Sequence, residues 1–216
     1  MLLGMWIPLG LALVFVYALV AWLGWWRPVF RDERPVQRWV WAVPAVFVVC
    51  IVLAIDYSAL SEKSLGFVLA LVVATQMVSW GDEGMFRGIG DVTLRDHGLP
   101  EGTVALWSSV VFGLVHITNA LGSRGAGALG QAVAVSLAGY FLYLVRRAAR
   151  STWLNSVLHG FFDFAILTGT AILVDQKAYA GSVAAVLAYL VLGILLVVRR
   201  RHIEPAATPP ASAAAA

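Results

Sequence analysis

Charged residues are scarce in this chain of 216 residues. They make up 12% of the sequence, whereas hydrophobic residues make up 61%; soluble domains have about 25% charged residues. A soluble two-domain protein would need a polar surface that this composition does not supply. The composition therefore predicts an integral membrane protein.

Three further features are absent or nearly so. The single cysteine, Cys50, excludes an intrachain disulfide. The first apolar run has no basic segment before it and exceeds the roughly 7–15 residues of a signal-peptide core, so we expect it to be a membrane span. The helix-borne zinc-protease signature HExxH is missing as well.

Long apolar runs fill most of the sequence, and most approach the roughly 20 residues that a helix needs to cross a bilayer. We expect an all-α polytopic helix bundle of about seven spans, or eight if residues 87–102 form a re-entrant piece. The seven spans are predicted at 2–26, 39–55, 65–86, 103–121, 126–145, 152–174 and 179–198. The third to sixth spans are expected to form the core of the bundle.

We treat residues 1–203 as a single membrane domain, with a motif core at about 65–175. Residues 204–216 are rich in proline and alanine, and we expect this tail to be disordered.

The basic residues predict the orientation of the bundle. With the N-terminus outside, 12 of the 15 basic residues lie in inside connections, at 27–38, 87–95, 146–150 and 199–201. The other three are Lys63, Arg124 and Lys177. The positive-inside rule therefore predicts a multi-pass cell-membrane protein with a cytoplasmic C-terminus. We attribute the net charge of +3 to topology and expect no nucleic-acid partner.

Few ionisable residues lie within or beside the central spans, and each is a candidate functional residue because charge is costly to bury there. These candidates are Asp82, Glu83, Arg87, His116, His159 and Asp163. Glu83 and Arg87 are four residues apart, so they share a helix face and can pair. His159 and Asp163 have the same spacing, which would let the carboxylate fix the tautomer of the ring. Asn155 lies one turn before His159 on the same face.

A carboxylate and two histidines that converge in a membrane cavity predict water activation. The carboxylate can take a proton from water, and a histidine can stabilise the oxyanion that forms on an attacked carbonyl. The same groups could hold a divalent metal such as zinc, with Glu83, His116 and His159 as candidate ligands. The sequence leaves both mechanisms open. It also permits a purely structural role, in which Glu83 and Arg87 form a buried ion pair and His159 and Asp163 form a packing hydrogen bond.

The depths of the two histidines set a condition on a shared site. His159 lies about 7 residues from the inside boundary, or ~10 Å deep, whereas His116 lies about 13 residues from position 103, or ~20 Å deep. The two can meet if residues 103–108 form a helix below the membrane.

Three short motifs occur in order along the chain: DEGMFR at 82–87, FGLVH at 112–116 and HGFFD at 159–163. Together they resemble EExxxR, FxxxH and HxxxN or HxxxD of the CAAX prenyl protease and bacteriocin-processing (CPBP) family of intramembrane proteases. The resemblance covers roughly residues 65–175. It implies an intramembrane endopeptidase that hydrolyses a peptide bond of a membrane-associated or lipid-modified, CAAX-like protein or peptide.

The resemblance also implies roles for individual residues. Water would be activated at Asp82, Glu83 or both, together with His116. His159 would stabilise the oxyanion or position the water, Asp163 would orient His159, and Arg87 would hold the acid pair. The implied partners are the peptide or protein substrate and the lipid bilayer. The family is described as glutamate-dependent, with older assignments as metal-dependent, so the cofactor expected is none or a divalent metal.

One departure from the family pattern bears on activity. The first acid of EExxxR is usually the catalytic glutamate, but this chain has Asp82 there. The shorter side chain holds its carboxylate about 1.5 Å closer to the backbone, and a shift of about 1 Å can cost ~10²-fold in rate. Either Asp82 works with an adjusted backbone, or Glu83 takes the role, or the protein is an inactive relative that acts as a membrane binding, immunity or scaffold protein. A proton-coupled transporter is a further alternative.

Overall fold

The computed structural model describes residues 2–121, 125–170 and 179–205. Within these ranges the regular structure is helical, and the only β-type pairing is one isolated bridge between Arg31 and Ser151. The predicted all-α fold is therefore confirmed. The end of the predicted span 152–174 and the predicted tail from residue 206 onward lie outside the described residues.

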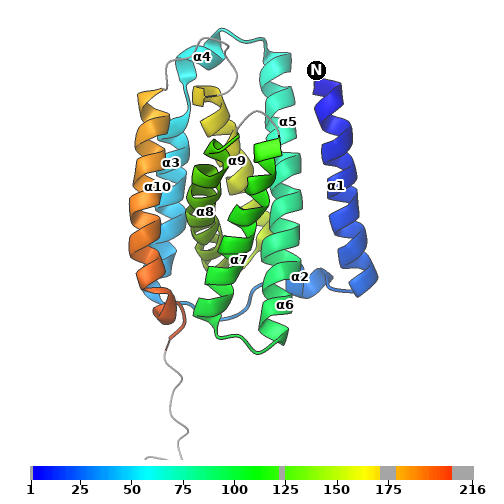
Figure 1. Ribbon diagram of the computed structural model, residues 1–216, viewed down its shortest axis with the longest axis vertical. Helices are drawn as coiled ribbons and strands as arrows, with labels where there is room; N and C mark the ends of the chain where they lie inside the picture. The colour runs from blue at the N-terminus through cyan, green and yellow to red at the C-terminus, as the bar shows by residue number, and fades with distance from the viewer. Residues whose placement is uncertain (1, 122–124, 171–178, 206–216) are drawn as a thin grey trace, which may run out of the picture.

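Within the described ranges, seven helices have 13 residues or more, and they run roughly side by side along the long axis of the molecule (Figure 1). They are α1 (Leu2–Leu23), α3 (Ala42–Ala54), α5 (Leu65–Asp82), α7 (Glu101–Val115), α8 (Gly127–Ala149), α9 (Thr152–Thr170) and α10 (Ala180–Val198). Shorter elements join them: α2 (Trp26–Phe30), α4 (Tyr57–Ser61), α6 (Asp91–Asp96), the π-helix η2 (Glu83–Gly90) and the 3₁₀ turns η1 (Arg38–Trp41), η3 (His116–Leu121) and η4 (Arg200–His202).

Five helical segments of the described chain are long and apolar enough to cross a membrane. They are Trp6–Leu23, Leu65–Asp96, Glu101–Leu121, Gly127–Ala149 and Ala180–Val198. The segment Arg38–Ala54 is a shorter apolar helix. These findings support a polytopic membrane protein, and the count of seven or eight spans stays a prediction.

Local sequence signals explain where several helices begin and end. The side chain of Ser64 caps α5 by accepting a hydrogen bond from the backbone N–H of Phe67 at 3.3 Å. Helix α8 ends where Arg150 adopts a left-handed conformation with φ 55°. Gly98 takes up a similar conformation, with φ 75°, just after α6, as is common after the last turn of a helix.

The helix that carries the first motif is longer than the sequence predicts. Helix α5 continues without a break through η2 and α6 as far as Asp96. Most of the segment 87–102, which was considered as a re-entrant piece, extends the preceding helix, and its placement relative to the membrane stays a prediction. The predicted span 103–121 begins earlier, at Glu101, and changes from α to 3₁₀ geometry at His116.

Helix α8 lies in the middle of the bundle and contacts α3, α7, α9 and α10. Its segment 138–148 is buried throughout. Helix α1 stands at the edge, where its contacts are with α2, α5 and η2 (Figure 1). The three motifs lie at the junction of α5 and η2, at the junction of α7 and η3, and on α9. Helices α7 and α9 each contact η2 and α8.

Candidate active site

The acid and arginine of the first motif lie where an α-helix becomes a π-helix. Asp82 is the last residue of α5, and the π-helix begins at Glu83 and includes Arg87. π-Helical turns are rare and occur frequently at functional sites. Both Glu83 and Arg87 are completely buried, so this turn directs two opposite charges into the bundle.

Glu83 is bound through both carboxylate oxygens. The Nδ1 atom of His159 lies 2.9 Å from Oε1, and the amide of Asn155 donates a hydrogen bond to Oε2. The Nε atom of Arg87 lies 3.8 Å from Oε2. Asn155 and His159 are one turn apart on α9, so the buried carboxylate joins α9 to the π-helix.

Arg87 links the π-helix to two further helices. Its Nη2 atom donates a hydrogen bond of 2.6 Å to the carbonyl oxygen of Gly139 on α8. Its guanidinium carbon lies 4.4 Å from the centre of the Phe112 ring on α7, a cation–π contact. Gly139 permits this approach, because a Cβ atom there would lie 2.7 Å from Nη2 of Arg87 and 2.9 Å from Cδ1 of Phe112.

The two histidines of the motifs meet at Phe112. Its ring centre lies 5.1 Å from that of His116 and 5.8 Å from that of His159, and both contacts are edge-on. The Nδ1 atom of His116 lies 2.9 Å from the carbonyl oxygen of Phe112. Because a carbonyl only accepts, this contact assigns the proton of a neutral ring to Nδ1 and leaves Nε2 with a free lone pair.

Asp163 lies at the other side of His159. Its Oδ2 atom is 3.5 Å from Nε2 of His159, and the side chain is 30% exposed. It is also within electrostatic range of His116. His159 therefore has a carboxylate oxygen near each of its ring nitrogens, Glu83 at Nδ1 and Asp163 at Nε2.

Asp82 differs from Glu83 in its exposure and in its contacts. Its side chain is partly exposed and forms no hydrogen bond or ion pair with any described residue. It is within electrostatic range of His159 and Asp163, and it lines a groove of about 240 Å³ between α1 and α5–η2. The apolar side chains of this groove include Leu9, Leu13, Val16, Met77, Met85 and Phe86. Asp82 is thus the free acid of the pair, and Glu83 is the engaged one.

The proposed metal ligands do not fit a metal site. Among the described residues, no three His, Cys, Asp or Glu side chains are grouped so that they could hold a metal ion. Glu83 contacts His159, whereas His116 packs on the other residue of its motif, Phe112. Glu83, His116 and His159 are therefore not arranged as a set of zinc ligands.

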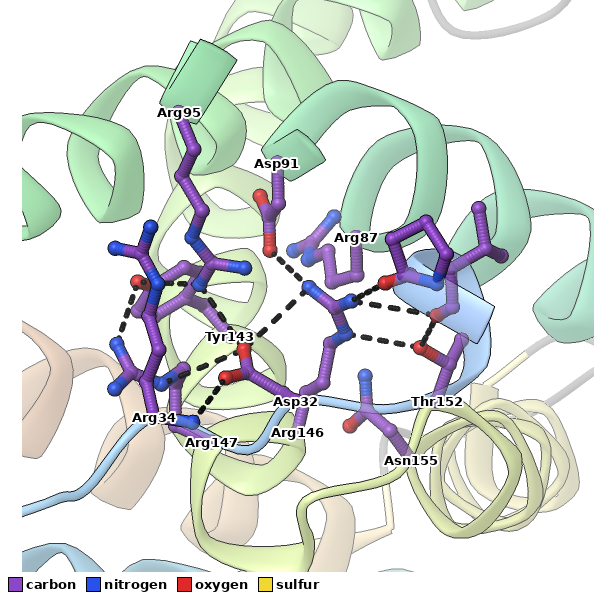
Figure 2. A network of polar contacts seen from close by, with 12 residues as sticks. Asp32, Arg34, Arg87, Asp91, Arg95, Tyr143, Arg146, Arg147, Thr152 and Asn155 are labelled. Atoms are coloured by element: carbon purple, nitrogen blue, oxygen red, sulfur yellow. Dashed lines mark hydrogen bonds and ion pairs between the residues drawn. The ribbon is translucent and has the colours of Figure 1, made fainter. Parts of the chain in front are cut away.

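A network of charged side chains, most of them buried, lies next to the site (Figure 2). Its arginines were predicted to lie in inside connections. Arg146 is completely buried and donates to Asp91 at 2.8 Å, to Thr152 at 2.9 Å and to the carbonyl oxygen of Pro28 at 3.1 Å. Asp91 lies one turn after Arg87, so this part of the network continues directly from the first motif.

The second half of the network surrounds Glu101, the first residue of α7. Its carboxylate accepts hydrogen bonds from Arg34 at 2.9 Å, from Arg95 at 3.1 Å, and from Arg147 and Tyr143. Arg95 also pairs with Asp32, and Arg147 with Glu204, each at 3.0 Å. These contacts join the segment that contains Asp32 and Arg34 to α6, α7, α8 and the C-terminal segment at Glu204.

The sequence contains some signal for these missed residues. Asp91 and Arg95 follow Arg87 at intervals of four, which places them on one helix face. The partners Arg146, Glu101 and Gly139 come from other helices, so spacing along the chain did not identify them.

The described helices thus bury a Glu–His–Asn–Arg cluster next to Asp82, a carboxylate without a hydrogen-bond partner among the described residues. Residues 64–165 match the family described as type II CAAX prenyl endopeptidase Rce1-like. This segment contains all three motifs. The comparisons with curated proteins and with solved structures give no match. The match supports the resemblance of this segment to the CPBP family, the family of CAAX prenyl proteases and bacteriocin-processing proteins.

Proposed function

We propose that this protein is an intramembrane endopeptidase that hydrolyses a peptide bond of a membrane-associated or lipid-modified protein, with Asp82 as the general base. The observation that carries the proposal is the unequal environment of the two adjacent acids. Glu83 is fully buried and bound to His159 and Asn155, whereas Asp82 is unpaired and borders an open groove. A base must reach both water and substrate, and Asp82 is the acid that meets this requirement.

In the proposed reaction the Asp82 carboxylate removes one proton from a water molecule. The water oxygen attacks the carbonyl carbon of the scissile peptide bond, and a tetrahedral oxyanion forms. Collapse of the oxyanion breaks the C–N bond, and the protonated Asp82 returns its proton to the leaving amine. The products are a carboxylic acid and an amine, and Asp82 regains its initial charge.

The histidines would act on the water and on the oxyanion. The free lone pair at Nε2 of His116 can accept a hydrogen bond from the water and orient it, since Nδ1 is held by the carbonyl oxygen of Phe112. Nε2 of His159, when protonated, can donate to the oxyanion. Glu83 and Asp163 hold the His159 ring from opposite sides, and Arg87 and Asn155 hold Glu83.

We infer that the N-terminus lies outside and the C-terminus in the cytoplasm. Contacts among the four arginine-rich connections support a common side: Arg34 pairs with Glu101, Arg31 forms a bridge to Ser151, and Arg147 pairs with Glu204. Figure 1 draws α2, α6 and the end of α10 at the same end of the bundle. The positive-inside rule then assigns that end to the cytoplasm.

The second candidate function, a catalytically inactive binding, immunity or scaffold protein, rests on Asp82 itself. Where the family usually has glutamate, the aspartate holds its carboxylate closer to the helix backbone. The same groove and buried cluster would then bind a peptide without cleaving it.

A cleavage assay separates the two functions. The purified protein in detergent is incubated with a fluorogenic prenylated CAAX peptide and with a panel of apolar membrane peptides. The wild type is compared with Asp82→Asn, Asp82→Glu, His116→Gln and His159→Gln, each with and without a chelator. We expect cleavage by the wild type and by Asp82→Glu, and loss of cleavage in the other three variants.

Two outcomes would contradict the proposed mechanism. Full activity of Asp82→Asn would remove Asp82 as the base. Absence of cleavage by a folded wild type, combined with cleavage by Asp82→Glu, would establish that the natural aspartate makes the protein inactive. Loss of cleavage with the chelator, and its recovery with added zinc, would require a metal in place of the metal-free route.

A further inference from the structure

The groove between α1 and α5–η2 is apolar except for one acidic residue, Asp82. Its lining is almost entirely aliphatic and aromatic, but it includes Asp82, whose carboxylate has no hydrogen-bond partner among the described residues. An ionised carboxylate only accepts hydrogen bonds. The groove therefore offers apolar contact together with a single strong acceptor.

Helix α1 forms the outer wall of the groove and contacts the rest of the bundle through α5, η2 and α2. The hydroxyl of Tyr17 donates a hydrogen bond of 3.0 Å to the carbonyl oxygen of Trp80, just before Asp82. Close approach is possible at Gly84, where a Cβ atom would lie 3.0 Å from Val16. Only 11% of the apolar segment Trp6–Leu23 of α1 is buried inside the protein, whereas 56% of the corresponding segment of α8 is buried. The groove thus opens at the lipid-facing edge of the bundle.

We propose that this groove binds an extended, apolar segment of the substrate's peptide chain, which enters from the bilayer between α1 and α5 and donates a main-chain N–H to Asp82 before cleavage. The proposal rests on the proposed function of Asp82 and adds the substrate's entry route and its recognition. Hydrogen-bond complementarity favours a peptide over a lipid chain, because an extended peptide has unpaired N–H donors and a hydrocarbon chain has none.

We expect Gly81 to determine which substrate side chains the groove accepts. It lines the groove directly before Asp82, and a Cβ atom built on it meets nothing within 4 Å. A larger residue at this position therefore fills the groove and leaves the packing of the bundle intact. Gly66, on the same helix, also has open space around it but does not line the groove, so it provides a matched control.

The first test measures binding and needs no cleavage. In a Cys50→Ala background, which removes the single natural thiol, Gly81→Cys and Gly66→Cys are labelled with N-ethylmaleimide. Labelling is repeated with the capped apolar peptide acetyl-Leu-Val-Leu-amide, with its fully N-methylated analogue, and with farnesyl methyl thioether. At about ten times its dissociation constant, the peptide should slow labelling at position 81 about tenfold by mass action. Labelling at position 66 should stay unchanged.

The three probes give distinct outcomes. Protection by the peptide alone supports the proposal. Equal protection by the N-methylated analogue shows that the N–H donors are not recognised, and protection by the thioether assigns the groove to a lipid chain. Either result, or no protection by any probe, overturns the proposal.

The second test uses cleavage. Gly81→Leu should lower kcat/KM for peptides with a large apolar residue beside the scissile bond by on the order of tenfold or more, relative to peptides with alanine there. The control Gly66→Leu should leave the ratio of the two kcat/KM values unchanged. An unchanged ratio in Gly81→Leu would show that the groove does not bind this part of the substrate. Absence of cleavage by the wild type would count against the proposed function, and the thiol-protection result would still decide what the groove binds.

Discussion

The Nδ1 atom of His159 lies 2.9 Å from the Oε1 atom of Glu83, a residue 76 positions earlier in the chain. Both side chains are buried, and Asn155 holds the second oxygen of the same carboxylate. This contact fixes the orientation of the imidazole ring relative to Asp82, which directly precedes Glu83. We therefore expect the two acids of the first motif to contribute differently to stability and to the proposed catalysis.

Removal of Glu83 should destabilise the fold. Glu83→Ala leaves the buried guanidinium of Arg87 without its carboxylate, and loss of one partner of a buried pair costs about 3–5 kcal/mol. The free energy of unfolding can be measured in mixed detergent micelles. The control is Glu33→Ala, whose pair with Arg27 is exposed and is expected to contribute less than about 1 kcal/mol. Equal effects of the two substitutions would contradict the anchoring role of Glu83.

Substitution of Asp82 should show the opposite pattern. Because Asp82 makes no hydrogen bond with a described residue, Asp82→Asn should leave the unfolding temperature nearly unchanged. The rate of peptide hydrolysis should fall ~10²–10⁴-fold, the usual contribution of a general base. Steady-state kinetics and thermal unfolding on the same preparation check both parts. A large loss of stability without a change in rate would reject the assignment.

A methyl group at Gly139 should disturb the site from the opposite side of Arg87. Gly139→Ala places a Cβ atom 2.7 Å from Nη2 of Arg87 and 2.9 Å from Phe112, and overpacking of this kind typically costs about 1–3 kcal/mol. Both stability and hydrolysis should decrease. On the same helix, Gly130→Ala meets nothing within 4 Å and should be neutral or slightly stabilising. Identical behaviour of the two variants would show that Arg87 moves aside freely.

The ionic network should stabilise the end of the bundle that carries α6 and the start of α7. Glu101→Ala removes the carboxylate shared by Arg34, Arg95 and Arg147. Arg95 keeps Asp32 and Arg147 keeps Asp32 and Glu204, so the buried positive charge is only partly compensated. We expect a loss of about 3–5 kcal/mol in the free energy of unfolding. Glu62→Ala, at an exposed position, is the control. An unchanged midpoint for Glu101→Ala would indicate that water compensates the arginines.

The sequence was sufficient to predict the fold class and the location of the motifs. Hydrophobic runs predicted the long helices because a membrane span has to be continuously apolar over many residues. The spacing of Glu83 and Arg87 predicted their pairing, since residues four apart share a helix face. His159 and Asp163 were expected to be neighbours for the same reason, and their atoms lie 3.5 Å apart.

Contacts between distant segments were not predictable in the same way. The sequence suggested Asp163 as the main partner of His159, but Glu83 is the closer one, at 2.9 Å. Arg146 and Arg147 were assigned to an inside connection between two spans, but both lie on α8 and are completely buried. Charge counts near the ends of apolar runs do not distinguish a solvated arginine from one whose carboxylate partner comes from another helix. The π-helical turn at Glu83–Gly90 has no simple sequence pattern either.

The contact between Arg147 and Glu204 has a consequence for the order of assembly. During synthesis α8 reaches the membrane before the segment that contains Glu204 is made, whereas Asp32 and Glu101 are already present. Arg147 can therefore pair first with acids from earlier segments, and its contact with Glu204 at 3.0 Å forms last. The hydrogen bond from the N–H of Gln37 to the carbonyl oxygen of Ile203, at 2.8 Å, must form at the same late stage. The ionic network is therefore incomplete when α8 is first inserted, and the C-terminal segment adds its last contacts.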